Sequence, residues 1–89
     1  MLEQEIVINS KDGLHARPAS LFVAEAAKFS SCTVKVVFGE KIVNAKSIIS
    51  VLSLGVIKGS KVKIQTEGYC AEQAMQAMVN LCENVLNKE

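Results

Sequence analysis

The sequence predicts an α+β fold in which a four-stranded antiparallel sheet is covered on one face by three helices. Hydrophobic spacing alternates along the chain between a period of two, typical of strands, and about 3.6, typical of helices. The resulting element order is βαββαβα, and split βαβ units of this kind place all helices on one side of a sheet. The chain has 89 residues, of which 49% are hydrophobic, so we expect a single domain over residues 1–89 with a modest core.

The first half of the fold begins with a predicted strand at residues 5–8. A loop with the turn signal Asp12-Gly13 follows, and a helix is predicted over residues 16–29. Pro18 is tolerated only in the first turn of a helix, so this helix should begin at His15 or Ala16. Its expected inner face consists of Ala19, Phe22, Val23, Ala26 and Phe29.

The second half begins with an antiparallel hairpin. Residues 33–38 and 41–44 alternate as strands around a tight turn at Gly39-Glu40. A short helix at 47–54, closed by Gly55, precedes a fourth strand at 61–66. The last helix is predicted over 71–86, and its expected core stripe consists of Ala71, Ala74, Met75, Met78, Leu81, Cys82 and Val85.

The short helix at 47–54 has more apolar surface than one sheet face can bury. Its apolar residues cover an arc of about 220°, whereas a core-facing helix needs an apolar stripe of only about 100°. If Val51 and Leu54 face inward, some of Ile48, Ile49 and Leu52 must be exposed, which suggests a docking surface. The alternative is that the following loop, with Val56 and Ile57, covers the excess.

Charge and cysteine usage exclude several classes of function. The net charge of +1 and the lack of a basic cluster argue against direct nucleic-acid binding, and no apolar run is long enough for membrane insertion. We expect a cytoplasmic protein, because no signal segment precedes the first strand. Cys32, Cys70 and Cys82 show no ligand-like spacing, so reduced thiols are expected and no metal site.

Residues 13–20 (GLHARPAS) hold the one histidine of the chain at the expected start of the first helix. The unpaired N–H groups of a first helical turn and the positive end of the helix dipole attract anions. Imidazole can act as a nucleophile, and a guanidinium such as that of Arg17 can donate hydrogen bonds to phosphate. His15 is therefore a candidate phosphate carrier; the alternative is a helix cap or an ordinary surface residue.

Ser47 stands at the expected start of the second helix. Its simplest role is that of an N-cap, because a serine side chain satisfies one unpaired N–H group there. A phosphate at a helix N-terminus is also electrostatically favourable. Ser47 is therefore also a candidate phosphorylation site.

These two segments resemble the signatures of one known family. Residues 13–19 (GLHARPA) resemble the active-site signature of HPr, the phosphohistidine carrier of the bacterial phosphoenolpyruvate-dependent sugar phosphotransferase system. Residues 44–55 (NAKSIISVLSLG) are similar to the family's second signature, around its regulatory serine. The resemblance covers essentially the whole chain, and it implies an open-faced β-sandwich of four antiparallel strands under three helices.

The resemblance implies a relay mechanism. His15 would accept a phosphoryl group on Nδ1 from enzyme I and pass it to the enzyme IIA domains of sugar permeases. Arg17 would balance the phosphate charge, and Ala16 and Pro18 would form the helix start that aims the N–H groups. The relay needs no metal or cofactor on this chain, which would be one component of a phosphotransferase relay and not a stand-alone enzyme.

Regulation is the second implication of the resemblance. Ser47 would be phosphorylated with ATP by an HPr kinase/phosphorylase, as in low-GC Gram-positive bacteria, for carbon catabolite repression through a catabolite-control transcription factor. Some members have methionine where this chain has Ile49 and Leu52, which keeps the surface apolar but stiffer. The shared docking face would consist of Ser20, Leu21, Ala24, Ile48, Ile49 and Leu52.

Other interpretations remain. The family includes a paralogue that lacks the histidine and serves only regulation, and the presence of His15 excludes that assignment here. It also includes a paralogue of nitrogen-related phosphotransfer, which stays an alternative. A different class is a non-catalytic α+β protein-binding module in which His15 and Ser47 are only caps. We expect a monomer.

Overall fold

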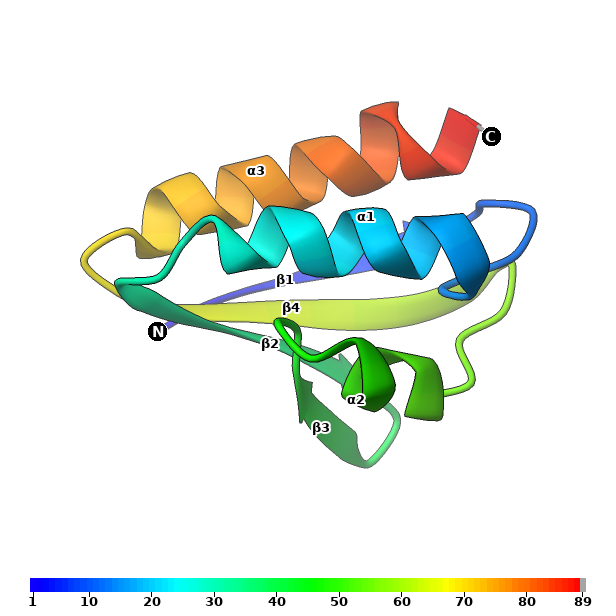
Figure 1. Cartoon of the computed structure of the whole chain (residues 1–89), viewed down its shortest axis with the longest axis horizontal. Helices are drawn as coiled ribbons and strands as arrows, with labels where there is room; N and C mark the ends of the chain where they lie inside the picture. The colour runs from blue at the N-terminus through cyan, green and yellow to red at the C-terminus, as the bar shows by residue number, and fades with distance from the viewer. Residues whose placement is uncertain (89) are drawn as a thin grey trace.

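Strand pairing sets the architecture of the molecule. The structure, a computed structural model, describes residues 1–88. Its antiparallel sheet has the order β1-β4-β2-β3, formed by β1 (Leu2–Ile8), β4 (Ser60–Gly68), β2 (Cys32–Phe38) and β3 (Lys41–Asn44). Three helices lie on one face of it: α1 (Ala16–Ala27), α2 (Ile48–Ser53) and α3 (Ala71–Asn84) (Figure 1). The predicted fold class and element order are confirmed.

The core lies between the sheet and the helices. Alternate strand residues point toward the helices and are buried, among them Ile8, Val36 and Ile64, while their neighbours face solvent. Helix α1 contributes Phe22 and α3 contributes Met78, both with no exposed surface. A sheet with one buried and one solvated face gives this alternation. No helix within residues 1–88 has the length and apolar content needed to cross a membrane.

The structure corrects several predicted boundaries. Strand β1 begins at Leu2 and not at residue 5, because Leu2 pairs with Thr66 of β4. Helix α1 ends at Ala27, so Phe29 of its predicted inner face lies beyond the helix and is half-buried. Helix α3 ends at Asn84, and a 3-10 turn (Leu86–Lys88) follows.

The stripe predicted for the last helix is therefore wrong at its end. Val85 is 39% exposed, whereas Leu86 is fully buried. The change of helix type after Asn84 rotates the chain, so that Leu86 faces the core in place of Val85. Elsewhere the stripe is confirmed, except that Ala71 is only half-buried.

Helix α2 has the predicted excess of apolar surface. Val51 and Leu54 are buried, while Ile49 is 78% exposed and Ile48 37%. The following loop does not cover them, because Val56 is buried in the core and Ile57 is itself exposed. Helix α2 packs against α1 and β3. The side chains of Ile48 and Ile49 therefore remain accessible on its outer side.

Candidate functional site

His15 lies at the entrance to α1. It is the N-cap residue, its backbone is extended (φ −127°, ψ 160°), and its side chain makes no capping hydrogen bond. The side chain is exposed at one end of the molecule. The first turn of α1 leaves N–H groups without intrahelical partners, which gives this end of the helix a positive potential. The imidazole thus stands next to a region that favours an anion.

The residue after His15 has an unusual backbone. Ala16 has φ +54°, and it is the one residue other than glycine with a positive φ in the described part of the chain. In the left-handed region a Cβ atom comes close to the following carbonyl oxygen, which costs about 1–2 kcal/mol. The strain lies at the peptide that joins His15 to its helix. No residue pattern around Ala16 predicts this strain.

The loop before His15 is fixed by contacts with a distant loop. Ser10 is fully buried, and its Oγ donates a 2.6 Å hydrogen bond to the Gly13 carbonyl. The Leu14 N–H donates to the Val56 carbonyl at 3.1 Å. A Cβ atom on Gly13 would overlap that carbonyl oxygen and lie 2.7 Å from the Ile57 Cα. Gly13 is therefore required for close backbone approach as well as for its φ of +62°.

The 3-10 turn (Leu86–Lys88) contacts the start of the same loop. The Asn87 Oδ1 accepts a 2.7 Å hydrogen bond from the Asn9 N–H, and its Nδ2 donates to the Val7 carbonyl at 2.9 Å. The Gly59 N–H donates to the Ile8 carbonyl. Segments far apart in the sequence thus hold the chain that leads to His15. Sequence reasoning missed Ser10 and Asn87, since each acts through partners that only the fold brings near.

The other residues of the first α1 turn differ in exposure. Ala16 and Arg17 are exposed beside His15, whereas Pro18 is buried in the first turn, as its missing N–H requires. The predicted helix start is confirmed. Arg17 follows His15 by two residues and belongs to the first turn of α1.

Ser47 is the N-cap of α2. Its Oγ accepts a long 3.4 Å hydrogen bond from the Ser50 N–H, and the residue is half-buried. The preceding Lys46 ties this helix start to the segment between α1 and β2, because its Nζ donates to the Phe29 carbonyl at 2.7 Å and to the Cys32 carbonyl at 2.5 Å. The capping role of Ser47 is thus confirmed.

The six residues of the expected docking face come from two adjoining helices. Ser20, Leu21 and Ala24 lie on α1, while Ile48, Ile49 and Leu52 lie on α2, which packs against α1. Four are exposed, whereas Leu21 and Leu52 are half-buried against the core. A partner would therefore meet mainly Ser20, Ala24, Ile48 and Ile49. The docking role stays a prediction.

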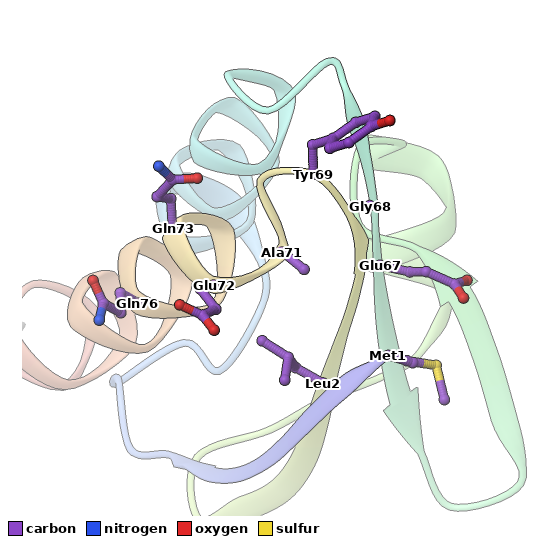
Figure 2. Close-up of a pocket in the computed structure, with 9 residues that line it drawn as sticks. All are labelled: Met1, Leu2, Glu67, Gly68, Tyr69, Ala71, Glu72, Gln73 and Gln76. Carbon is purple, nitrogen blue, oxygen red and sulfur yellow. The ribbon is translucent and has the colours of Figure 1, made fainter.

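A shallow hollow lies at the opposite end of the sheet. It has a volume of about 470 Å³ and is lined by the start of β1, the end of β4 and the first turns of α3 (Figure 2). The carboxylates of Glu67 and Glu72 extend to opposite sides in Figure 2. Because β1 and β4 are antiparallel, this end is far from the loop that leads to His15. The hollow is therefore separate from the candidate site.

No group of three or more histidine, cysteine or acidic side chains within residues 1–88 is arranged to hold a metal ion. The family model for the PTS HPr component phosphorylation site matches residues 2–84. The chain belongs to the PTS HPr family.

Comparison with individual relatives supports the same family. It is 42% identical over 78 residues to the phosphocarrier protein HPr of Mycoplasma capricolum, covering 88% of this chain and 86% of the relative. It is equally identical over 83 residues to the HPr-like protein Crh of Halalkalibacterium halodurans, with 93% and 98% covered.

Solved structures match closely as well. HPr from Thermoanaerobacter tengcongensis superposes with a TM-score of 0.94 at 48% identity, covering 100% of this chain and 98% of that one. A second structure from the same organism, an HPr dimer, matches with a TM-score of 0.74 at 49% identity, covering 90% and 93%. The open sheet and three helices of this chain are thus the HPr fold, and the chain is a phosphocarrier-family member of the phosphotransferase system.

Proposed function

We propose that this chain carries a phosphoryl group on His15 between enzyme I and the enzyme IIA domains of sugar permeases. The observation that carries the proposal is the placement of His15. In a chain of the HPr family, the one imidazole stands exposed at the N-cap of α1, with its side chain unused in capping. An exposed helix end can be reached by several partners in turn, which a relay requires.

The transfer is an exchange of nitrogen–phosphorus bonds. The Nδ1 atom of His15 attacks the phosphorus of a phosphohistidine on enzyme I, and the bond to the donor nitrogen breaks as the new bond forms. The N–H groups at the start of α1 and the Arg17 guanidinium donate to the phosphoryl oxygens. Ala16 and Pro18 fix the direction of those N–H groups. The second transfer, to enzyme IIA, reverses the roles.

The carrier role is tested with purified enzyme I and labelled phosphoenolpyruvate. We expect an acid-labile phosphoryl group on the wild-type chain, none on His15→Ala, and full labelling of the matched variant Ser47→Ala. Absence of label on the folded wild type would refute the proposal and favour a non-catalytic binding module. Labelling by the enzyme I of a nitrogen-related system, and not by that of the sugar system, would favour the nitrogen-related paralogue.

We also propose that Ser47 is a regulatory phosphorylation site for an ATP-dependent HPr kinase/phosphorylase. A phosphate there lies at the N-terminus of α2, next to the exposed Ile48 and Ile49. The added negative charge would oppose docking of enzyme I and could form a contact for a catabolite-control transcription factor. Mass spectrometry after treatment with ATP and the kinase tests this, with Ser50→Ala as the control. An unmodified Ser47 in the wild type would remove the regulatory role.

The docking face is a further part of the proposal. Substituting Ile49 by Asp places a charge on a side chain that is 78% exposed, so folding should be kept while enzyme I binds less tightly. The control is Ile42→Asp, which is 58% exposed but lies on β3, outside the face. Equal binding of the two variants would exclude this face. We expect a monomer in the cytoplasm, and sedimentation equilibrium tests the oligomeric state.

A further inference from the structure

Two of the three cysteines meet at the end of the sheet away from His15. Cys32 is the first residue of β2 and pairs in register with Gly68 of β4. Cys70 follows Gly68 by two residues and is the N-cap of α3. The Cys70 thiol lies close enough to Cys32 to raise the pKa of the Cys32 thiol. Cys70 lies in the turn between Tyr69 and Ala71, both labelled in Figure 2.

Gly68 makes this approach feasible. A Cβ atom at that position would lie 2.8 Å from the Cys32 Cβ, closer than such atoms come in proteins, and the φ of Gly68 is +122°. Only glycine allows β2 and β4 to come together here and the chain to turn back toward α3. The turn brings Cys70 against Cys32.

The two thiols differ in accessibility. Cys32 is 5% exposed, and its Sγ donates to the Phe29 carbonyl at 3.6 Å. Burial raises the pKa of the Cys32 thiol to about 11, with a further rise from Cys70 and an opposing effect of Lys46. Cys70 is only half-buried, and its side chain makes no capping bond to α3. A small reagent from solvent therefore meets Cys70 first.

We propose that Cys32 and Cys70 form a redox-reactive pair that hydroperoxides convert to an intramolecular disulfide, with Cys70 as the attacking thiol and Cys32 as the resolving one. The Cys70 thiolate attacks one peroxide oxygen, the O–O bond breaks, and Cys70 becomes a sulfenic acid as the second oxygen leaves as hydroxide. The Cys32 sulfur then attacks the Cys70 sulfur and displaces the sulfenic oxygen, which takes up the thiol proton and leaves as water. In sum, two thiols and hydrogen peroxide give one disulfide and two molecules of water.

The bond would lock a specific part of the fold. It closes the loop from residue 32 to residue 70, which contains the hairpin of β2 and β3, the whole of α2 and strand β4. Ser47 lies within this loop, whereas His15 lies outside it, one α1 length of about 18 Å away along the helix. Oxidation should therefore rigidify the segment that carries Ser47 and leave the imidazole unchanged. The inference does not depend on the proposed phosphotransfer.

The test treats the folded wild-type chain with a small excess of hydrogen peroxide and maps its disulfides. Trypsin alone leaves Cys70 and Cys82 in one peptide, so digestion has to include cleavage after Glu72 to separate them. We expect residues 29–35 linked to the peptide with Cys70, while Cys82 stays reduced, since it is fully buried in α3. The oxidised chain should melt roughly 10–25 °C higher, and dithiothreitol should reverse the shift.

Variants assign the roles of the two thiols. In Cys32→Ala, Cys70 cannot be resolved and should accumulate a sulfenic acid that dimedone captures. In Cys82→Ala, the bond should form as in the wild type. Three outcomes would each overturn the proposal. The wild-type chain could keep three free thiols while its exposed Met1 oxidises, the disulfide could include Cys82, or the disulfide could join two chains. Should Cys32→Ala not fold, the peptide map of the wild type still decides.

Discussion

Substitution of Gly13 by Ala tests whether the close contact between the His15 loop and residues 56–57 supports the fold. The added Cβ would overlap the Val56 carbonyl oxygen and lie 2.7 Å from the Ile57 Cα, so the loops must separate. Separation weakens the hydrogen bond from the Leu14 N–H to Val56, currently 3.1 Å long. Gly39→Ala is a matched control, because Gly39 has φ +63° against +62° for Gly13 but nothing within 4 Å of its Cβ position.

The magnitude follows from the difference between the two sites. Both variants bear the left-handed backbone penalty of about 1–2 kcal/mol. Gly13→Ala adds about 1–3 kcal/mol of steric strain and about 1 kcal/mol for the lost hydrogen bond. It should therefore lower the free energy of unfolding by about 2–4 kcal/mol more than Gly39→Ala, a further drop in Tm of roughly 10–30 °C.

Thermal unfolding followed by circular dichroism measures the difference in stability. Phosphorylation by enzyme I, at a temperature where both variants are folded, measures the effect on His15, and we expect Gly13→Ala to be slower than Gly39→Ala. Equal losses of Tm in the two variants would show that only backbone conformation matters at Gly13. The contact with residues 56–57 would then have no energetic role.

Three further perturbations test other features of the molecule. Ala16→Gly should raise Tm by a few degrees, because glycine adopts the φ of +54° without the left-handed penalty of about 1–2 kcal/mol. The greater chain entropy of glycine in the unfolded state offsets about 0.5–1 kcal/mol of this gain. A lower Tm would argue against strain at this peptide. Lys46→Met should lower the free energy of unfolding in urea by about 1.5–3 kcal/mol, since two carbonyl oxygens lose a charged donor. The control Lys58→Met, on the surface, should change this free energy little. Similar values for the two variants would show that the Lys46 contacts contribute nothing. Stability should fall above pH 9, because the unfolded chain releases the Cys82 thiol proton from its ordinary pKa of 9.0, whereas burial raises the pKa of Cys82 in the folded chain to about 12. Cys82→Ala should flatten the pH dependence of urea unfolding between pH 9 and 11 by up to about 1.4 kcal/mol per pH unit, and an unchanged slope would contradict this origin.

Much of this fold could be predicted from periodicity because the sheet has one buried and one solvated face. The hairpin around Gly39 and the amphipathic α3 are strong local signals, and the structure has both. The start of β1 could not be found in the same way. Leu2 is 37% exposed on an edge strand, so it is ordered by pairing with Thr66 and not by an apolar pattern of its own.

The candidate site, like the fold, could be predicted from the sequence only in part. His15 and the start of α1 could be located from the sequence, because the single proline restricts where the helix begins. The geometry that supports His15 could not, since it depends on pairs such as Leu14 with Val56 and Asn87 with Asn9. These partners are distant in sequence. Local propensity carries no information about such contacts.

The order of strands also has a consequence for the way the molecule forms during synthesis. Strand β1 has no neighbour other than β4, so the first strand made must wait for residues 60–66 before it can pair. The loop that holds His15 waits for residues 56–59 and for Asn87 as well. Such long-range pairing makes folding slow relative to helical proteins of this size. A nascent chain on the ribosome thus displays the His15 segment early, but this segment becomes structured only after Asn87 has emerged.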